Sequence, residues 1–426
     1  MKSQMETFIK RCGTSISAAV LALSLAGICL AQPTYTYTVV PAPDGTKSFF
    51  TFVADDGTIR GGSGLVDAGQ GIQLRQCYTY KDGTWTVLPT PSTNCHFTGA
   101  NKSGDFTGVL QFPGDQANHF FRYHNGGFEM LDSLIPRTLA GPTIVSPTSM
   151  NEQGDITGSI EIQEQTPYTV PFAPPGSGPF FTGTVESYAF VYSGGKIREL
   201  PKLSDAPAAT GLSKLGPFDF AYGINSKGDL VGYAMLQLAT GPSTPYTEHS
   251  VLWSHDGGII DLGTVGGTWS QALAINTSGQ VVGKSSVSDG EYDSTRHNIY
   301  HAFIYDNGSM RTLPTPGVYS TATGINDLGQ VIGTYYLAKS DGSVDFSVSY
   351  PFFWYQDGTA DAKVVDLQTL VPSLPAGTVL TGVSRINNNG QIVATGRQGD
   401  GANAADIELL LTPADPAQLP MRRTAR

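Results

Sequence analysis

The chain repeats one unit of about 50 residues, a period typical of propeller blades and solenoid repeats. Its fullest copy runs from Leu273 to Pro314 and opens LAINTSGQVVG. An apolar stretch ends in Ile275-Asn276, a Thr-Ser-Gly turn follows, and a stretch rich in β-branched residues begins at Gln280. Asn bonds its own backbone and Gly accepts a positive φ, so this spacing predicts a hairpin.

The second half of the unit predicts another hairpin. After a variable loop, His301–Tyr305 is an apolar and aromatic run of strand type. Asp306-Asn307-Gly308 contains Asn-Gly, the strongest two-residue hairpin signal. Met310–Leu313 then forms a further strand, which Pro314 ends because it lacks the N–H that a sheet ladder needs. Each unit is therefore predicted to be four short antiparallel strands.

The same offsets recur along nearly all of the chain. The asparagine of the first turn is present in six copies, and the first copy has Ala54 in its place. The glycine that closes this turn recurs in seven copies, at Gly57, Gly104, Gly154, Gly228, Gly279, Gly329 and Gly390. Seven copies of a four-stranded unit predict an all-β fold, a seven-bladed β-propeller over residues 35–413.

The two ends of the repeat array complement each other. The seventh copy stops at Thr412-Pro413 after three strands, and Tyr35–Pro41 alternates like the fourth strand of another copy. We therefore expect the N-terminal strand to complete the last blade, which also removes an exposed sheet edge. An open solenoid with frayed ends is the alternative.

Three motifs resemble those of a bacterial extracellular repeat family named for its His-Ala-Phe (HAF) tripeptide. The units of that family read roughly GIN-x-x-G-x-VVG, a loop, HAF-x-W, a turn and DLGT. The closest matches here are Gly324-Ile325-Asn326, His301-Ala302-Phe303 and Asp261-Leu262-Gly263-Thr264. The resemblance covers about residues 35–413. It implies β-propeller-like repeats in an extracellular protein, and it implies no activity because the family is largely uncharacterised.

The N-terminus predicts export. Lys2, Lys10 and Arg11 precede an apolar run from Ile16 to Leu30, which is the pattern of a signal peptide. We expect residues 1–31 to be this signal peptide, because the run is short for a membrane span. The protein is then secreted, and it is extracellular or periplasmic.

The net charge limits the classes of partner that we expect, and the cysteines predict a covalent link. The formal net charge is −11, and no Lys/Arg run appears before the C-terminal tail, which argues against nucleic acid and anionic membranes. We expect a monomer without a membrane span, with residues 414–426 as a disordered polar tail. In an exported protein Cys77 and Cys95 are expected to form a disulfide, and a pair of buried thiols is the alternative.

Binding residues are expected on the face that carries the variable loops, because rigid scaffolds present function there. Aromatic rings stack on sugars and carboxylates accept protons from hydroxyl groups, which suits a carbohydrate or protein ligand. The alternative for each single ring is that it packs its own loop down. The predicted ligand-binding residues are Tyr168, Phe172, Phe180, Phe181, Tyr246, Tyr292, Arg296, Tyr335, Tyr336 and Phe346.

Signatures of known catalytic sites do not appear in the sequence. Glu291, with Asp293 or Asp289, is a candidate carboxylate pair, which a solvated acidic loop or a weak Ca²⁺ site explains equally well. His119, His249 and His301 begin third strands and are expected to pack or hydrogen-bond within their blades, so no metal or other cofactor is predicted. The sequence favours a binding or scaffold module; a polysaccharide hydrolase or lyase, and a structural matrix protein, are the alternatives.

Overall fold

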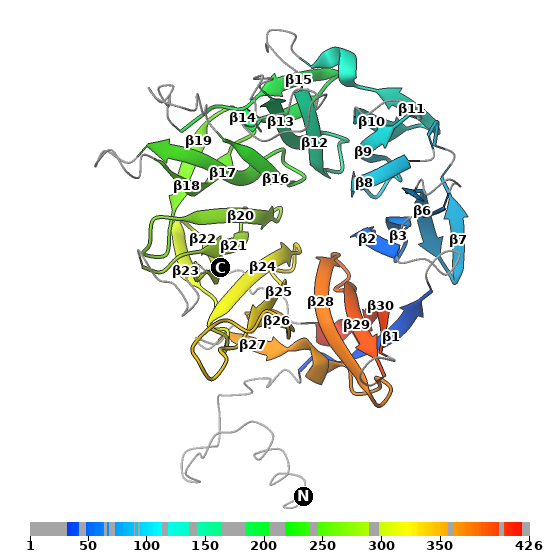
Figure 1. Cartoon of the computed structure of the whole chain (residues 1–426), viewed down its shortest axis with the longest axis vertical. Helices are drawn as coiled ribbons and strands as arrows, with labels where there is room; N and C mark the ends of the chain where they lie inside the picture. Colours follow the sequence, from blue (N-terminus) through cyan, green and yellow to red (C-terminus); the bar gives the residue numbers. More distant parts are fainter. Residues whose placement is uncertain are drawn as a thin grey trace, which may run out of the picture.

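The computed structural model describes residues 32–41, 48–63, 66–67, 73–88, 90–92, 94–112, 118–135, 143–163, 184–203, 218–237, 246–288, 298–356, 362–399 and 404–419. Seven four-stranded antiparallel sheets stand around a central axis, so the chain is a seven-bladed β-propeller (Figure 1). The predicted fold class is confirmed. The predicted signal peptide, residues 1–31, lies outside the described residues.

The blades follow one another along the chain, and each runs from its innermost strand to its outermost. Blades 1 to 3 are β2 (Ser48–Val53), β3 (Ile59–Ser63), β6 (Cys77–Lys81) and β7 (Thr84–Val87); β8 (Asn94–Ala100), β9 (Phe106–Gln111), β10 (His119–His124) and β11 (Gly127–Met130); β12 (Thr143–Met150), β13 (Ile156–Gln163), β14 (Thr184–Ser193) and β15 (Lys196–Glu199). Blades 4 to 6 are β16 (Phe220–Ile224), β17 (Leu230–Gln237), β18 (Tyr246–Trp253) and β19 (Ile259–Gly263); β20 (Ser270–Ile275), β21 (Val281–Ser285), β22 (His301–Asp306) and β23 (Ser309–Thr312); β24 (Tyr319–Ile325), β25 (Val331–Tyr336), β26 (Tyr350–Tyr355) and β27 (Lys363–Asp366).

The N-terminal strand closes the ring. Blade 7 consists of β28 (Thr378–Ile386), β29 (Ile392–Gln398), β30 (Ala405–Pro413) and β1 (Tyr35–Val40). β1 lies beside β30, with Tyr35 opposite Pro413 and Val40 opposite Glu408 (Figure 1). The Tyr35 ring is 2% exposed and meets Phe353 of blade 6 edge-on. The predicted closure is therefore confirmed.

Short elements connect or flank the blades. They are the two-stranded pair β4 (Val66–Asp67) and β5 (Gln73–Leu74), and the 3₁₀ turns η2 (Asp132–Leu134), η3 (Leu367–Leu370) and η5 (Pro416–Gln418). η5 falls in the expected C-terminal tail, where Leu419 is 8% exposed. Residues 420–426 lie outside the described part of the chain.

The predicted disulfide is present between Cys77 and Cys95, whose Cα atoms are 5.6 Å apart. Cys77 begins β6 of blade 1, and Cys95 is the second residue of β8, the inner strand of blade 2. The bond therefore ties neighbouring sheets together, and both sulfur-bearing residues are fully buried.

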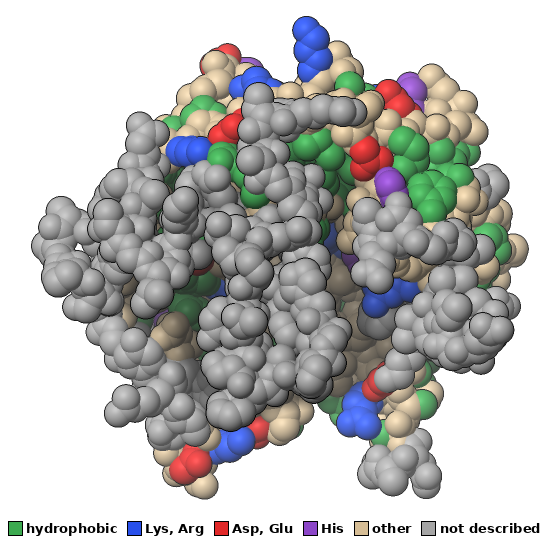
Figure 2. Space-filling view, turned by 45° about the horizontal axis from the view of Figure 1, so that its top comes forward, with side chains coloured by type: hydrophobic (Ala, Val, Ile, Leu, Met, Phe, Trp, Pro, Cys, Tyr) green, Lys and Arg blue, Asp and Glu red, His purple; other side chains and the backbone are tan. Residues whose placement is uncertain are grey.

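Charges of both signs are spread over the surface in Figure 2. Among the visible described side chains, Lys and Arg (blue) lie between Asp and Glu (red), and no large patch of one sign forms. In the described residues, no helix is long and apolar enough to cross a membrane.

The core lies between the blades, because side chains of the middle strands alternate between the two neighbouring sheets. Phe303 of β22 packs on the blade 4 side with Val231, and Ala302 packs on the blade 6 side with Ala322. A second glycine, four residues after the turn glycine in six of the seven repeats, lets this packing happen; the seventh repeat has Ala394 there. A Cβ on Gly283 would lie 2.0 Å from the carbonyl oxygen of Gln271, so only glycine fits there.

The repeated asparagine holds its own turn and the next blade together. The Asn276 Oδ1 accepts hydrogen bonds from the N–H groups of Ser278 and Gln280 at 3.1 and 3.0 Å. Its Nδ2 donates to the Gln280 Oε1 at 2.8 Å and to the main-chain oxygen of Asn326 in blade 6 at 3.0 Å. The sequence predicted the first role and missed the second.

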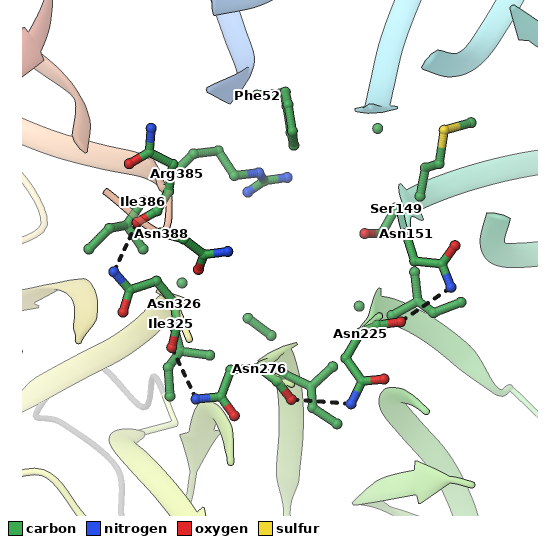
Figure 3. A pocket seen from close by; sticks show the side chains of 18 of the residues that line it. Phe52, Ser149, Asn151, Asn225, Asn276, Ile325, Asn326, Arg385, Ile386 and Asn388 are labelled. Atoms are coloured by element: carbon green, nitrogen blue, oxygen red, sulfur yellow. Dashed lines mark hydrogen bonds between the residues drawn. The ribbon is translucent and has the colours of Figure 1, made fainter. Parts of the chain in front are cut away.

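The inter-blade bond recurs around most of the ring (Figure 3). We call the five asparagines that donate these bonds, Asn151, Asn225, Asn276, Asn326 and Asn387, the asparagine clamp. Each Nδ2 donates to the main-chain oxygen of the matching residue in the next blade, and the last bond crosses the point where the ring closes. The bonds are Asn151 to Asn225 at 3.2 Å, Asn225 to Asn276 at 3.1 Å, Asn276 to Asn326 at 3.0 Å, Asn326 to Asn387 at 2.9 Å, and Asn387 to Ala54 at 2.7 Å.

Removing one clamp residue should destabilise the whole ring. Asn276→Ala removes the acceptor of two turn N–H groups and leaves the buried Gln280 N–H and the buried Asn326 oxygen without these partners, which costs about 3 kcal/mol of unfolding free energy. Urea unfolding followed by circular dichroism measures this loss. Asn118→Ala, at an exposed position, is the control. An Asn276→Ala protein as stable as the control would contradict the clamp.

Deleting residues 32–41 should open the ring. The deletion strips the outer strand from blade 7 and exposes the edge of β30, so we expect a lower melting temperature and self-association. Differential scanning calorimetry and light scattering measure both effects. A synthetic peptide of residues 32–41 should restore the melting temperature, and an unchanged melting temperature in the truncated chain would show that closure adds no stability.

Candidate functional site

Some predicted site residues fall within the described part of the chain. Tyr246 begins β18, Tyr335 and Tyr336 end β25, and Phe346 lies in the loop that follows β25. Tyr335 is 7% exposed, and its ring stacks on Tyr350 with centroids 5.1 Å apart, so it packs inside its blade. The others lie outside the described residues: Tyr168, Phe172, Phe180, Phe181, Tyr292, Arg296, Glu291, Asp293 and Asp289.

A continuous row of aromatic rings crosses the loop ends of blades 5 and 6. Trp269 stacks on Tyr300 with ring centroids 4.2 Å apart. Tyr300 meets Tyr319 edge-on at 5.7 Å. Tyr319 in turn contacts Tyr336 at 5.8 Å and Phe346 at 5.3 Å. We call these five residues the aromatic row.

The position of each ring follows from the repeat. Trp269 directly precedes β20, Tyr300 directly precedes β22, and Tyr319 begins β24, so these side chains lie at the ends of strands far from the asparagine turns. Phe346 is 46% exposed, and the other four are partly buried. The sequence predicted Tyr336 and Phe346 and missed the other three. Each of these three lies at the start of a first or third strand of its blade, and this position is the signal that could have found them.

Polar and charged groups accompany the rings. The Lys284 Nζ lies 5.2 Å from the Trp269 ring centroid and 5.3 Å from that of Tyr300. The Gln271 Nε2 donates to the Glu248 Oε2 at 2.9 Å. Burial raises the pKa of the Glu248 carboxyl, and hydrogen bonds from Gln271 and Trp269 oppose that rise. Burial also lowers the pKa of Lys284, which the charge of Glu248 opposes. The aromatic rings, the Lys284 cation, the Gln271 amide and the Glu248 carboxyl therefore lie together at the Trp269 end of the aromatic row.

A fully buried carboxyl lies beside β16 of blade 4. Asp219 is 2% exposed, and its Oδ1 accepts from the N–H of Met235 at 3.0 Å. Burial raises its pKa to about 6. Because it is closed off from solvent and bonded to the backbone, Asp219 supports β17 and is no reagent for a bound ligand.

The recurrent histidines are bonded inside their blades. The His119 Nδ1 lies 3.3 Å from the Asp132 Oδ2, and the His249 Nδ1 lies 3.0 Å from the Asp261 Oδ1. In the part of the chain that the structure describes, no three His, Cys, Asp or Glu residues are grouped so that they could hold a metal ion.

Comparisons with known proteins show the fold. Residues 268–403, less than half of the chain, match a family described as "Protein of unknown function (DUF3466)". No curated protein matches the sequence. The β-propeller domain of the Trilobed protease from Pyrococcus furiosus is similar, with a TM-score of 0.50 and 8% identity over 89% of this chain and 99% of that chain.

Two further solved structures match with lower scores. They are a protein of unknown function from Dyadobacter fermentans DSM 18053 (TM-score 0.39, 11% identity, 89% of this chain and 98% of that chain) and TolB from Acinetobacter baumannii (TM-score 0.34, 11% identity, 94% and 86%). The Pyrococcus domain is described as having an open velcro topology. In the present chain β1 closes blade 7.

A partly buried carboxyl beside the closing strand predicts how stability depends on pH. Glu408 of β30 lies opposite Val40 and Thr395, and burial raises its pKa to about 8. The folded protein therefore keeps this proton over a pH range in which the unfolded chain has lost it. The contribution of Glu408 to the free energy of unfolding is therefore fully present at low pH and is lost as the pH rises from about 4.5 to 8.

Glu408→Gln keeps the shape and stays neutral, so it should stabilise the fold at pH 8 by roughly 2–4 kcal/mol. At pH 5 the change should be small. Urea unfolding at both pH values measures the difference, with exposed Glu129→Gln as the control. Equal effects of Glu408→Gln at pH 5 and pH 8 would contradict the raised pKa.

Proposed function

We propose that this protein is a secreted binding module of the HAF repeat type that recognises an extracellular carbohydrate chain through the aromatic row. One observation carries the proposal. Five rings form an unbroken line across two blades, and Lys284, Gln271 and Glu248 lie beside the end of the line at Trp269.

Sugars present both an apolar ring face and a rim of hydroxyl groups. Aromatic side chains bury the apolar face, and a small number of polar groups fix the orientation of the ligand. Here Gln271 and Glu248 hold each other in place at 2.9 Å, so they are arranged before a ligand arrives. The line of rings is longer than a single sugar needs, which favours a chain of sugars over a free monosaccharide.

Binding is favoured over cleavage because glycoside hydrolysis uses two carboxyl groups that face the same bond. Glu248 lies next to the aromatic row, whereas Asp219 is buried and bonded to Met235. The hydrolase or lyase alternative therefore depends on Glu291, Asp293 and Asp289, which lie outside the described residues.

Trp269→Ala should weaken polysaccharide binding at least about tenfold, because a central aromatic contact dominates binding energy. Trp269→Phe should keep most of the affinity. The measurement is retention of the protein of residues 32–426 on a panel of neutral and acidic polysaccharides, with reducing ends assayed in the same tubes. Trp85→Ala in β7, an aromatic loss outside the row, is the control.

Retention without new reducing ends, lost in Trp269→Ala and kept in Trp85→Ala, supports the binding module. New reducing ends would establish an enzyme instead. A folded protein that no polysaccharide retains would contradict a carbohydrate ligand and favour a protein partner.

A further inference from the structure

The inner strands of all seven blades surround a central channel. At the asparagine-turn end of the ring, residues from every blade line a cavity of about 280 Å³ (Figure 3). This cavity is separate from the aromatic row, none of whose five residues lines it.

At one level of this channel, most blades have a small residue on the inner strand. Counting two residues back from the turn asparagine gives Gly99, Ser149, Gly223, Ala274 and Gly324 in blades 2 to 6. Close packing explains the small residues, since a Cβ on Gly99 would lie 2.8 Å from the N atom of Met150. Five blades therefore contribute glycine, serine or alanine to the channel wall at this level.

Blades 7 and 1 differ, because the same position holds Arg385 and Phe52. The Arg385 side chain points into the channel (Figure 3). Its Nη1 donates to the main-chain oxygen of the adjacent Ser384 at 3.0 Å. Among the described residues, no carboxylate lies within ion-pair distance of the Arg385 guanidinium.

The acidic residues that line the cavity have other partners. Asp55 pairs with the Lys102 Nζ at 2.8 Å. The Asp327 Oδ1 accepts from the N–H of Thr277 at 2.8 Å, and its Oδ2 accepts from Asn388 at 3.1 Å. Each is held by groups of the neighbouring blades, and neither is an ion-pair partner of Arg385.

The Arg385 guanidinium presents hydrogen-bond donors to the cavity. Its side chain is exposed to the water of the channel, and among the described residues the Ser384 oxygen is the acceptor that it bonds. A guanidinium carries five N–H donors in a planar fork, which suits it to a planar anion. A single arginine facing the cavity, at a level where five blades have a small residue, therefore points to an anionic ligand.

We propose that the channel binds a small carboxylate-bearing molecule, with the Arg385 guanidinium donating two parallel hydrogen bonds to the carboxylate. Planar guanidinium and planar carboxylate match in this way. A carboxylate is favoured over phosphate because Asp55, Asp327 and Glu152 share the cavity lining with a single lysine, Lys102, and would repel a doubly charged ion. The cavity of about 280 Å³ suits a molecule the size of one acidic sugar.

Isothermal titration calorimetry with the protein of residues 32–426, at pH 7 and constant ionic strength, tests the site. The probes are sodium glucuronate and sodium acetate, with methyl glucoside as the uncharged control and sodium phosphate as the dianion. We expect glucuronate to bind. Arg385→Met should weaken this binding at least about tenfold, because a charge-assisted hydrogen-bonded pair is lost.

Arg397→Met is the matched control, because Arg397 lies on β29 of the same blade and pairs at the surface with Asp406 at 3.5 Å. It should bind glucuronate like the wild type. Trp269→Ala should also bind it normally, which separates this site from the aromatic row. Arg385→Lys keeps the charge, and it serves if the methionine variant does not fold.

Melting temperatures without ligand give a second readout. Arg385→Met should melt at the same temperature as the wild type, because the exposed guanidinium is hydrated when no ligand is bound; a structural role for Arg385 would lower the melting temperature instead. Glucuronate binding that is unchanged in Arg385→Met would overturn the proposal. So would phosphate binding in the absence of carboxylate binding, or silence of all the probes with the wild type.

Discussion

The whole ring depends on asparagine side chains that bond two sheets at once. In each clamp residue the oxygen holds a turn, and the nitrogen reaches the backbone of the next blade, as in the 3.0 Å bond from Asn276 to Asn326. The amide is suited to this because it has both acceptor and donor groups on one short, stiff side chain. Aspartate would lose the donor, and serine would not span both sites. Apolar packing gives the blades their attraction, and the clamp fixes their relative position.

A second layer of bonds reinforces this edge of the ring. The residue after each clamp asparagine often bonds its counterpart in the next blade, as in Thr277 N–H to Asp327 at 2.8 Å and Asn388 N–H to Asp55 at 2.9 Å. The turn face is therefore tightly bonded. On the opposite face, the strand ends of blades 5 and 6 carry the aromatic row.

The fold could be predicted from the sequence because the four-stranded unit is repeated seven times. Turn chemistry, strand pattern and the spare N-terminal strand each pointed to one closed ring. The candidate site was harder to predict because its parts are far apart in the sequence. Trp269, Tyr300 and Tyr319 come together only when two blades pack, and Arg385 stands out only when the seven inner strands are compared at one level. Single-residue reasoning found Tyr336 and Phe346 because they lie in or beside a long loop.

Closure by β1 also sets an order for folding. Tyr35 lies opposite Pro413, so β1 finds its partner only after the rest of blade 7 has been synthesised. Contacts between such distant residues form slowly, because a very long loop must close first. Until then blade 7 is incomplete, and the ring has an open side between blades 7 and 1 that no local hairpin can fill. The ring is thus completed at a single strand pair, and a chain that ends before β30 lacks the strand that binds β1.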